Sequence, residues 1–132
     1  FTQAVLSDIA QGTCSALEHG YLTKIERQHG LPGPRRQSPT TVGRHGYRDV
    51  EYDEWGLLVE LDGLLHITAR ARDNDLERDL DAAVGEDRRS IRLGWGQVYE
   101  RPCSTAGKVA TMLGRLGWPG AFTRCPRCQP ER

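Results

Sequence analysis

The chain has 132 residues, of which 37% are hydrophobic, and this apolar content suits one core in one domain of common size. Its 18 Lys and Arg residues balance 18 Asp and Glu residues, so no net charge attracts it to DNA or to an anionic membrane, and DNA affinity must come from local patches. No apolar run approaches the roughly 20 residues of a spanning helix and no signal peptide opens the chain, which predicts a soluble cytoplasmic protein.

A helix from about residue 15 to residue 29 is the first predicted element. Ser15 and Glu18 have the spacing of a capping box, and apolar residues then recur at helical intervals, namely Leu17, Tyr21, Leu22 and Ile25. Pro32 and Pro34 end this helix, since proline cannot donate a helical hydrogen bond. Because the chain begins at Phe1 without a methionine, we expect a fragment of a longer protein that has a further N-terminal domain.

A β-hairpin is the clearest local prediction. Residues 47–52 alternate in the manner of a strand, Asp53 and Glu54 favour a turn, and residues 55–61 predict the second strand. A short extended strand at residues 35–41 is expected before the hairpin.

The second half of the chain predicts two helices around one strand. Residues 69–84 place Leu76, Leu80, Ala83 and Val84 on one helical face, with a solvated charged face opposite, and Gly85 can end this helix. Residues 90–95 predict a strand, residues 104–116 a last helix, and residues 117–132 an irregular tail packed on the same domain. The order of elements predicts an α/β (α+β) fold with a small mixed sheet flanked by helices.

Three carboxylates are predicted to converge on the hairpin. Asp49 lies within the first strand, where aspartate is depleted, and Glu60 and Asp62 share a face of the second strand because alternate residues point the same way. Carboxylates that converge repel each other unless a cation lies among them, and Mg²⁺ prefers such oxygen ligands. The pattern therefore predicts a Mg²⁺ (or Mn²⁺) site that activates water for attack on a phosphoryl group.

These residues resemble the active-site pattern of the PD-(D/E)XK, or restriction-endonuclease-like, nucleases, in which an Asp on one strand precedes Glu-x-Lys on the next. Asp49 and Glu60 match this pattern, whereas Asp62 occupies the place of the lysine. Bacterial domains related to very-short-patch repair endonucleases share this departure. Their helix Glu, strand Asp and "VExDGxxH" motif resemble Glu18, Asp49 and the stretch from Val59 to His66, and the likeness runs from about Cys14 to Leu113.

The resemblance implies a restriction-endonuclease-like core, a helix followed by a mixed sheet of about four strands, and a metal-dependent DNA endonuclease. It implies that Asp49 and Glu60 are the main Mg²⁺ ligands and that Asp62 is a further or alternative ligand. Without the lysine, another cation must neutralise the transition-state charge, and the sequence does not choose among Arg48, Arg70, Arg72 and Arg78.

Three more residues complete the implied catalytic set. Glu18 would approach from the first helix, although completing the capping box is an equally good account of it. His66 would act as a general acid/base or phosphate contact, since its ordinary pKa lies near neutrality, whereas a lone histidine is more often structural. Gln97, expected on the strand that follows the second helix, would line the same cleft.

DNA is the expected partner, held through salt-dependent phosphate contacts by Arg35, Arg36, Arg88 and Arg89. Many relatives of this fold act on two strands as dimers, so a homodimer stays open. A second hypothesis is a non-cleaving DNA-binding or protein-interaction module, because similar domains follow a winged-helix segment in proteins resembling type IV antitoxins. A third is a zinc-stapled structural domain whose acidic residues form only a charged surface.

Four cysteines, Cys14, Cys103, Cys125 and Cys128, predict a structural zinc site or four free thiols. Cys125 and Cys128 have the two-residue spacing that lets both thiolates reach one tetrahedral ion. The other two precede the first and last predicted helices, so folding can gather all four and fasten the tail to both helix starts. Very-short-patch relatives also carry a structural zinc, although its ligands do not map onto this chain residue by residue.

Overall fold

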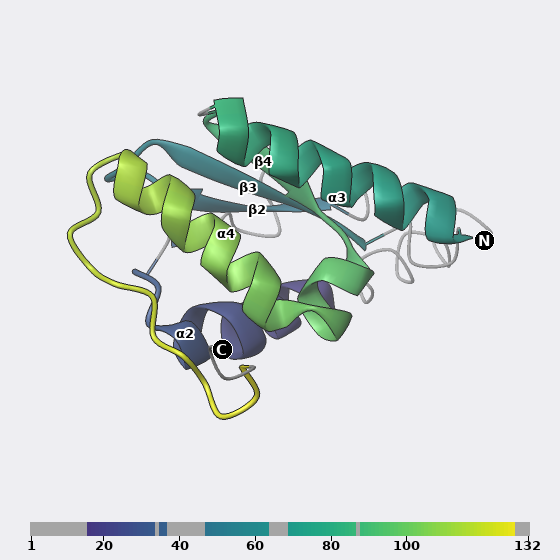
Figure 1. The fold of residues 1–132 in the computed structure, drawn as a ribbon, viewed down its shortest axis with the longest axis horizontal. Coiled ribbons are helices and arrows are strands. Elements are labelled where there is room, and N and C mark those ends of the chain that lie inside the picture. The colour runs from purple at the N-terminus through teal and green to yellow at the C-terminus, as the bar shows by residue number, and fades with distance from the viewer. Residues whose placement is uncertain (1–15, 34, 37–46, 64–68, 87, 129–132) are drawn as a thin grey trace, which may run out of the picture.

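The computed structural model describes residues 16–33, 35–36, 47–63, 69–86 and 88–128 (Figure 1). A first helix, residues 16–29, consists of α-helical residues 16–20, the π-helical turn η1 (Tyr21–Glu26) and α2 (Arg27–His29). The other elements are, in chain order, β1 (Arg35–Arg36), β2 (Tyr47–Tyr52), β3 (Leu57–Asp62), α3 (Ala69–Glu86), β4 (Ser90–Leu93), the π-helical turn η3 (Gly96–Glu100) and α4 (Pro102–Arg115). Residues 118–125 form no helix or strand.

The strands form one mixed sheet in the order β1-β2-β3-β4. The first three are antiparallel neighbours, whereas β3 and β4 are parallel and are joined by the crossover through α3. The fold is therefore α+β with a small mixed sheet and flanking helices, as the sequence predicts. Within the described ranges, no helix combines the length and apolarity needed to cross a membrane.

One hydrophobic core joins the sheet to its helices. Alternate residues of β3, Leu57, Val59 and Leu61, are buried, and they share the core with residues of the first helix, α3 and α4. The hydroxyls of Tyr21 and Tyr52 lie 2.8 Å apart and link the first helix to β2 inside this core. The intervening β3 residues Leu58 and Glu60 are only half-buried, so the opposite face of the sheet is the one that offers polar side chains.

The hairpin is confirmed, but its second strand begins at Leu57 rather than at residue 55. The turn is longer than predicted because the backbone N–H groups of Trp55 and Gly56 both donate to the carbonyl of Tyr52. Gly56 has a φ of 73°, a left-handed conformation that favours glycine and that a strand does not contain.

The prediction that Gln97 lies on a strand is wrong. The strand β4 ends at Leu93, because the chain then turns into η3. The Gly94 N–H donates to the Gln97 side-chain oxygen at 3.1 Å, and the Val98 N–H donates to the Gly94 carbonyl at 3.2 Å. Gln97 therefore sits in a helical turn and its side chain caps the end of β4.

Helix boundaries also differ from the prediction at two places. Helix α3 continues through Gly85 to Glu86, since one glycine near a helix end costs only about 1 kcal/mol. Helix α4 begins at Pro102, a residue that suits a first helical position because no intrahelical partner exists for its missing N–H.

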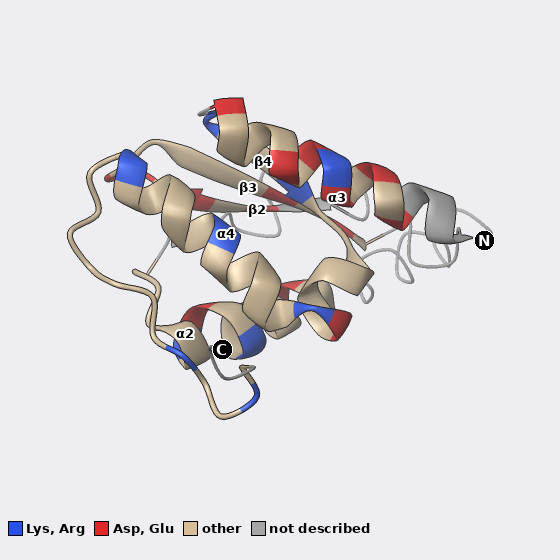
Figure 2. Ribbon diagram, in the orientation of Figure 1, with Lys and Arg blue, Asp and Glu red and all other residues tan. Residues whose placement is uncertain are grey.

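Acidic residues lie along α3 (Figure 2), and several of them pair with basic residues outside this helix. Asp73 accepts from Arg101 at 2.8 Å, and Lys108 of α4 lies 2.8 Å from Asp81 and 3.4 Å from Glu77. These pairs connect α3 to Arg101, which lies between η3 and α4, and to α4 itself. Each is partly exposed, so each stabilises the fold by at most about 1 kcal/mol.

Candidate metal centre and carboxylate pair

Asp49 and Glu60 lie directly opposite each other in the antiparallel pair of β2 and β3. Residues in such positions point to the same face of a sheet, and their Cβ atoms are about 5 Å apart. Both side chains are half-buried, so solvent and ligands can reach them. The two carboxylates thus share one face of the sheet, as a shared metal site requires.

Arg92 of β4 extends this pair across the sheet, because it lies opposite Glu60 on the other side. Its guanidinium Nη2 lies 3.5 Å from Glu60 Oε2, and both side chains are about one-third exposed, at 33% each. We call Asp49, Glu60 and Arg92 the charged ladder. Sequence reasoning did not single out Arg92, since the register of a parallel strand that follows a crossover helix leaves no local signal.

Asp62 differs from the ladder residues because it is fully buried, with 0% of its surface exposed. The carbonyl of the next residue, Gly63, accepts a hydrogen bond from Trp95 Nε1 at 3.0 Å, and the Trp95 side chain therefore lies near this end of β3. His66 lies outside the described residues, as do the side chains of Arg48, Arg70 and Arg72.

Glu18 and Gln97 have different surroundings. Glu18 Oε2 is buried and has no hydrogen-bond partner within the described part of the chain, and Ser15, its expected capping partner, lies outside that part. Gln97 is fully buried, and its amide donates to Glu77 Oε1 at 3.4 Å while its oxygen accepts from Gly94. Both ends of the Gln97 amide are thus engaged in joining η3 to α3 and to β4.

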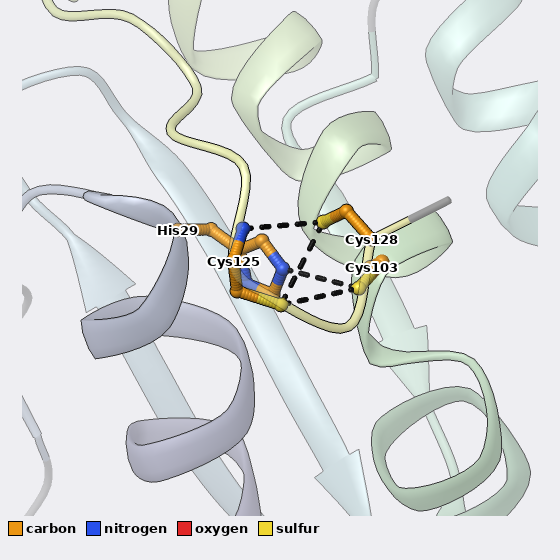
Figure 3. Close-up of side chains that lie close together, drawn as sticks. All are labelled: His29, Cys103, Cys125 and Cys128. Carbon is orange, nitrogen blue, oxygen red and sulfur yellow. Dashed lines mark hydrogen bonds between the residues drawn. The ribbon is translucent and has the colours of Figure 1, made fainter. Parts of the chain in front are cut away.

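A second cluster brings together His29, Cys103, Cys125 and Cys128 (Figure 3). Their ligand atoms all lie within 4.8 Å of one another. His29 ends the first helix, Cys103 lies in the first turn of α4, and Cys125 and Cys128 belong to the tail. This group can bind a metal ion such as zinc, and within the described residues the three carboxylates of the hairpin form no comparable group.

The predicted four-cysteine site is thus changed in one ligand. Cys103, Cys125 and Cys128 come together as predicted, whereas Cys14 lies outside the described residues. His29 fills the fourth position, and sequence reasoning missed it because one histidine at a helix end carries no spacing signal. A histidine followed by a helix-ending glycine, ahead of two prolines, was the available hint.

Hydrogen bonds already favour a thiolate in this cluster. Burial alone would raise the pKa of Cys125, but its sulfur accepts from the backbone N–H groups of Arg127 and Cys128 and from neighbouring thiols, and its pKa is lowered. Burial and hydrogen bonds with Cys128 and Cys125 raise the pKa of Cys103 to about 12. A bound cation would lower the pKa of Cys103, since metal-bound thiols lose their protons.

The arginines expected to contact DNA are partly visible. Arg88 and Arg89 are exposed just before β4, and they line a hollow together with Arg115, Met112 and Leu116. Arg88 also pairs with Glu86 at 2.8 Å. The side chains of Arg35 and Arg36 on β1 lie outside the described part of the structure.

Comparisons of the chain with protein-family models, with curated proteins and with solved structures give no match. A function must therefore be argued from the charged ladder and from the cluster of His29 with three cysteines.

Proposed function

We propose that the chain is a metal-dependent DNA endonuclease domain in which Asp49 and Glu60 hold Mg²⁺ or Mn²⁺. The observation that carries this proposal is the direct opposition of these two carboxylates on one half-exposed face of the sheet. Two acidic side chains in such positions repel each other, and a divalent cation bound by both would offset this repulsion, beside the partial offset that Arg92 gives to Glu60.

The order of the elements supports the same proposal. A helix precedes a three-strand antiparallel meander, and a crossover helix then leads to a fourth strand parallel to the third. A helix followed by a mixed sheet of this size is the core implied by the resemblance to restriction-endonuclease-like nucleases. Asp49 and Glu60 lie on two consecutive strands joined by a short turn, which agrees with the Asp on one strand and Glu on the next that the resemblance expects.

The residues present fit a hard divalent cation, because carboxylate oxygens are the ligands that Mg²⁺ prefers. When bound, Mg²⁺ would supply polarisation of the phosphoryl oxygen and a lower pKa for water. Asp49 and Glu60 would hold the ion, and Asp62, buried two residues further along β3, would orient or complete this ligand set.

Arg92 would take over the role of the missing lysine, which is to neutralise charge on the phosphate. Its guanidinium lies 3.5 Å from Glu60 Oε2, and its side chain is 33% exposed, so a phosphate can reach it. A guanidinium can donate two parallel hydrogen bonds to a phosphate, and a charge fixed on a strand needs no reorganisation when charge develops on the substrate. Arg92 would thereby contact the phosphate next to the ion.

The exposed Arg89 would contact the DNA backbone at the start of β4. It lies three residues before Arg92 in sequence, about 10 Å along an extended chain, and its side chain lines the hollow beside Met112 and Arg115 of α4. Phosphate contacts of this kind position DNA without selecting a base sequence.

Two observations favour a second function, a nuclease fold retained for binding DNA or protein, as in antitoxin-like proteins. Glu60 is engaged by Arg92 at 3.5 Å, and Asp62 stands where the catalytic lysine is expected. An acidic residue already paired with arginine holds a metal less strongly, so this arrangement would suit a domain that no longer cleaves.

Cleavage of supercoiled plasmid by the purified wild-type chain tests the first function. We expect nicked and linear products with Mg²⁺ or Mn²⁺ and none with a chelator or with Ca²⁺, which binds carboxylates but supports hydrolysis poorly. Gel electrophoresis of a time course is the measurement. If binding of duplex DNA is detected by fluorescence anisotropy while no metal ion produces cleavage, the second function is the correct one.

A further inference from the structure

We propose that His29, Cys103, Cys125 and Cys128 bind one Zn²⁺ ion in a closed structural site that fastens the C-terminal tail to the first helix and to α4. The inference does not depend on the proposed hydrolytic function, because the two sets of residues share no member and the zinc site needs no substrate.

The separations between the ligand atoms are those of a tetrahedral zinc site. With Zn–S bonds of about 2.3 Å and a Zn–N bond of about 2.0 Å, tetrahedral geometry places two sulfurs about 3.8 Å apart and a nitrogen about 3.5 Å from each sulfur. Cys125 Sγ lies 3.5 Å from Cys103 Sγ and 3.7 Å from Cys128 Sγ. His29 Nε2 lies 3.4 Å from Cys103 Sγ.

Disulfide bonding does not explain these distances. A disulfide requires about 2.05 Å between sulfurs, and the three described cysteines are all free thiols. A disulfide would also pair two of the three sulfurs and leave the third, whereas Cys125 is almost equally close to both neighbours.

His29 is oriented as a metal ligand. Its Nδ1 lies 3.0 Å from the carbonyl of Ile25, and since a carbonyl can only accept, Nδ1 carries the proton and Nε2 presents its lone pair to the cysteines. A backbone carbonyl in this role is the usual outer partner of a zinc-binding histidine. The ring is fully buried and stacks on Phe122, with ring centroids 5.2 Å apart, so its position is fixed from both sides.

The turn from Cys125 to Cys128 is arranged to hold two thiolates. The Cys128 N–H donates to the Cys125 carbonyl at 3.0 Å and closes the turn, while the Cys125 N–H donates to Cys128 Sγ at 3.3 Å. Backbone N–H groups that point at sulfur offset the negative charge of thiolates. Figure 3 shows the Cys125 sulfur linked to the sulfurs of both Cys103 and Cys128, beside the His29 ring.

The ligand chemistry selects zinc and a structural role. Three soft thiolates and one imidazole in a tetrahedral arrangement favour Zn²⁺ over the hard cations that suit carboxylates. Such a site has net charge −1, and basic side chains line the hollow beside Cys103 and Cys128, namely Lys108, Arg124 and Arg127. Four protein ligands leave no open position for water or substrate, which is the mark of a structural site.

A zinc site would stabilise the C-terminal tail, whose described residues have few other contacts with the domain. Residues 118–125 form no helix or strand, and apart from Cys125 itself they contribute only two partly buried side chains to the core, Trp118 and Phe122. One backbone hydrogen bond, from the Thr123 N–H to the His29 carbonyl at 2.8 Å, ties the tail to the first helix. A zinc ion would add four bonds at the point where the tail crosses both helices.

Metal analysis of the full chain tests the inference. We expect one zinc per chain in the wild type and in the matched control Cys14→Ser, and loss of stoichiometric zinc in Cys125→Ser and Cys128→Ser. The substitution His29→Cys should retain zinc, because a thiolate can replace the imidazole. Zinc absent from the wild type, or lost in Cys14→Ser, would overturn the proposed ligand set.

X-ray absorption spectroscopy keeps the test decisive where a cysteine variant fails to fold, since it needs only the wild type and Cys14→Ser. We expect three sulfurs at about 2.3 Å and one nitrogen at about 2.0 Å around zinc in both proteins. Four sulfurs in the wild type would instead assign the fourth ligand to Cys14, and mostly oxygen neighbours would show zinc bound elsewhere.

Discussion

Replacing Glu60 with glutamine is expected to lower the rate of Mg²⁺-dependent plasmid cleavage at least about 100-fold. Loss of a residue that merely supports a metal ligand typically costs 10–100-fold in metal affinity or activity, so loss of a direct ligand should cost about 100-fold or more. Glutamine keeps the shape of the side chain and removes only its charge. The measurement is the initial rate of nicking at several Mg²⁺ concentrations.

A matched control separates the role of Glu60 from a general loss of negative charge. Glu54 is exposed in the turn of the same hairpin, so Glu54→Gln removes one charge near the same strands and should cleave at the wild-type rate. Glu60→Gln also breaks the ion pair with Arg92, but a pair that is one-third exposed contributes at most about 1 kcal/mol. Cleavage by Glu60→Gln at the wild-type rate would mean that the activity arises at another site.

Removing the Zn²⁺ ion proposed for His29, Cys103, Cys125 and Cys128 is expected to lower the free energy of unfolding by about 4 kcal/mol or more. An ion that binds only the folded chain stabilises it by about 4 kcal/mol when its concentration exceeds the dissociation constant 1,000-fold. For a chain of this length, the loss corresponds to a fall in Tm of about 10–20 °C. Thermal unfolding followed by circular dichroism, before and after dialysis against a chelator, measures the change.

The structure also predicts where the chelated protein should loosen. Arg124 and Arg127 flank Cys125 in the tail, and trypsin should cut at these residues faster after the metal is removed, with protection restored by added Zn²⁺. Mass spectrometry identifies the cut. An unchanged Tm together with unchanged cleavage in the tail would contradict a structural role for the site.

Much of the strand pattern could be predicted from the sequence, because a hairpin is a local structure. The strand at residues 47–52 has the predicted bounds, and the pairing of Asp49 with Glu60 follows once the turn at residues 53–56 sets the register. The sequence predicts that β3 begins at Trp55, because tryptophan suits a strand. In the structure the left-handed conformation of Gly56 keeps Trp55 in the turn.

Contacts between distant segments could not be predicted in the same way. Arg92 lies beside Glu60 only because α3 returns the chain parallel to β3, and the register of such a crossover depends on how the helix packs. His29 joins the cysteines because the tail folds back over the first helix, a path that no local pattern encodes. The sequence predicts a strand at Gln97, whereas the helical turn after Gly94 includes a hydrogen bond from the Gly94 N–H to the Gln97 side chain, which no local pattern encodes.

Titration of the zinc-loaded protein with Mn²⁺, followed by electron paramagnetic resonance, tests most directly the claim that the opposed carboxylates form a metal site. The account predicts one Mn²⁺ site per chain in the wild type and in Glu54→Gln, and at least about tenfold weaker binding in Asp49→Asn and in Glu60→Gln. Wild-type binding that is absent, or that is unchanged in both ladder variants, would contradict it and leave the charged ladder without a metal.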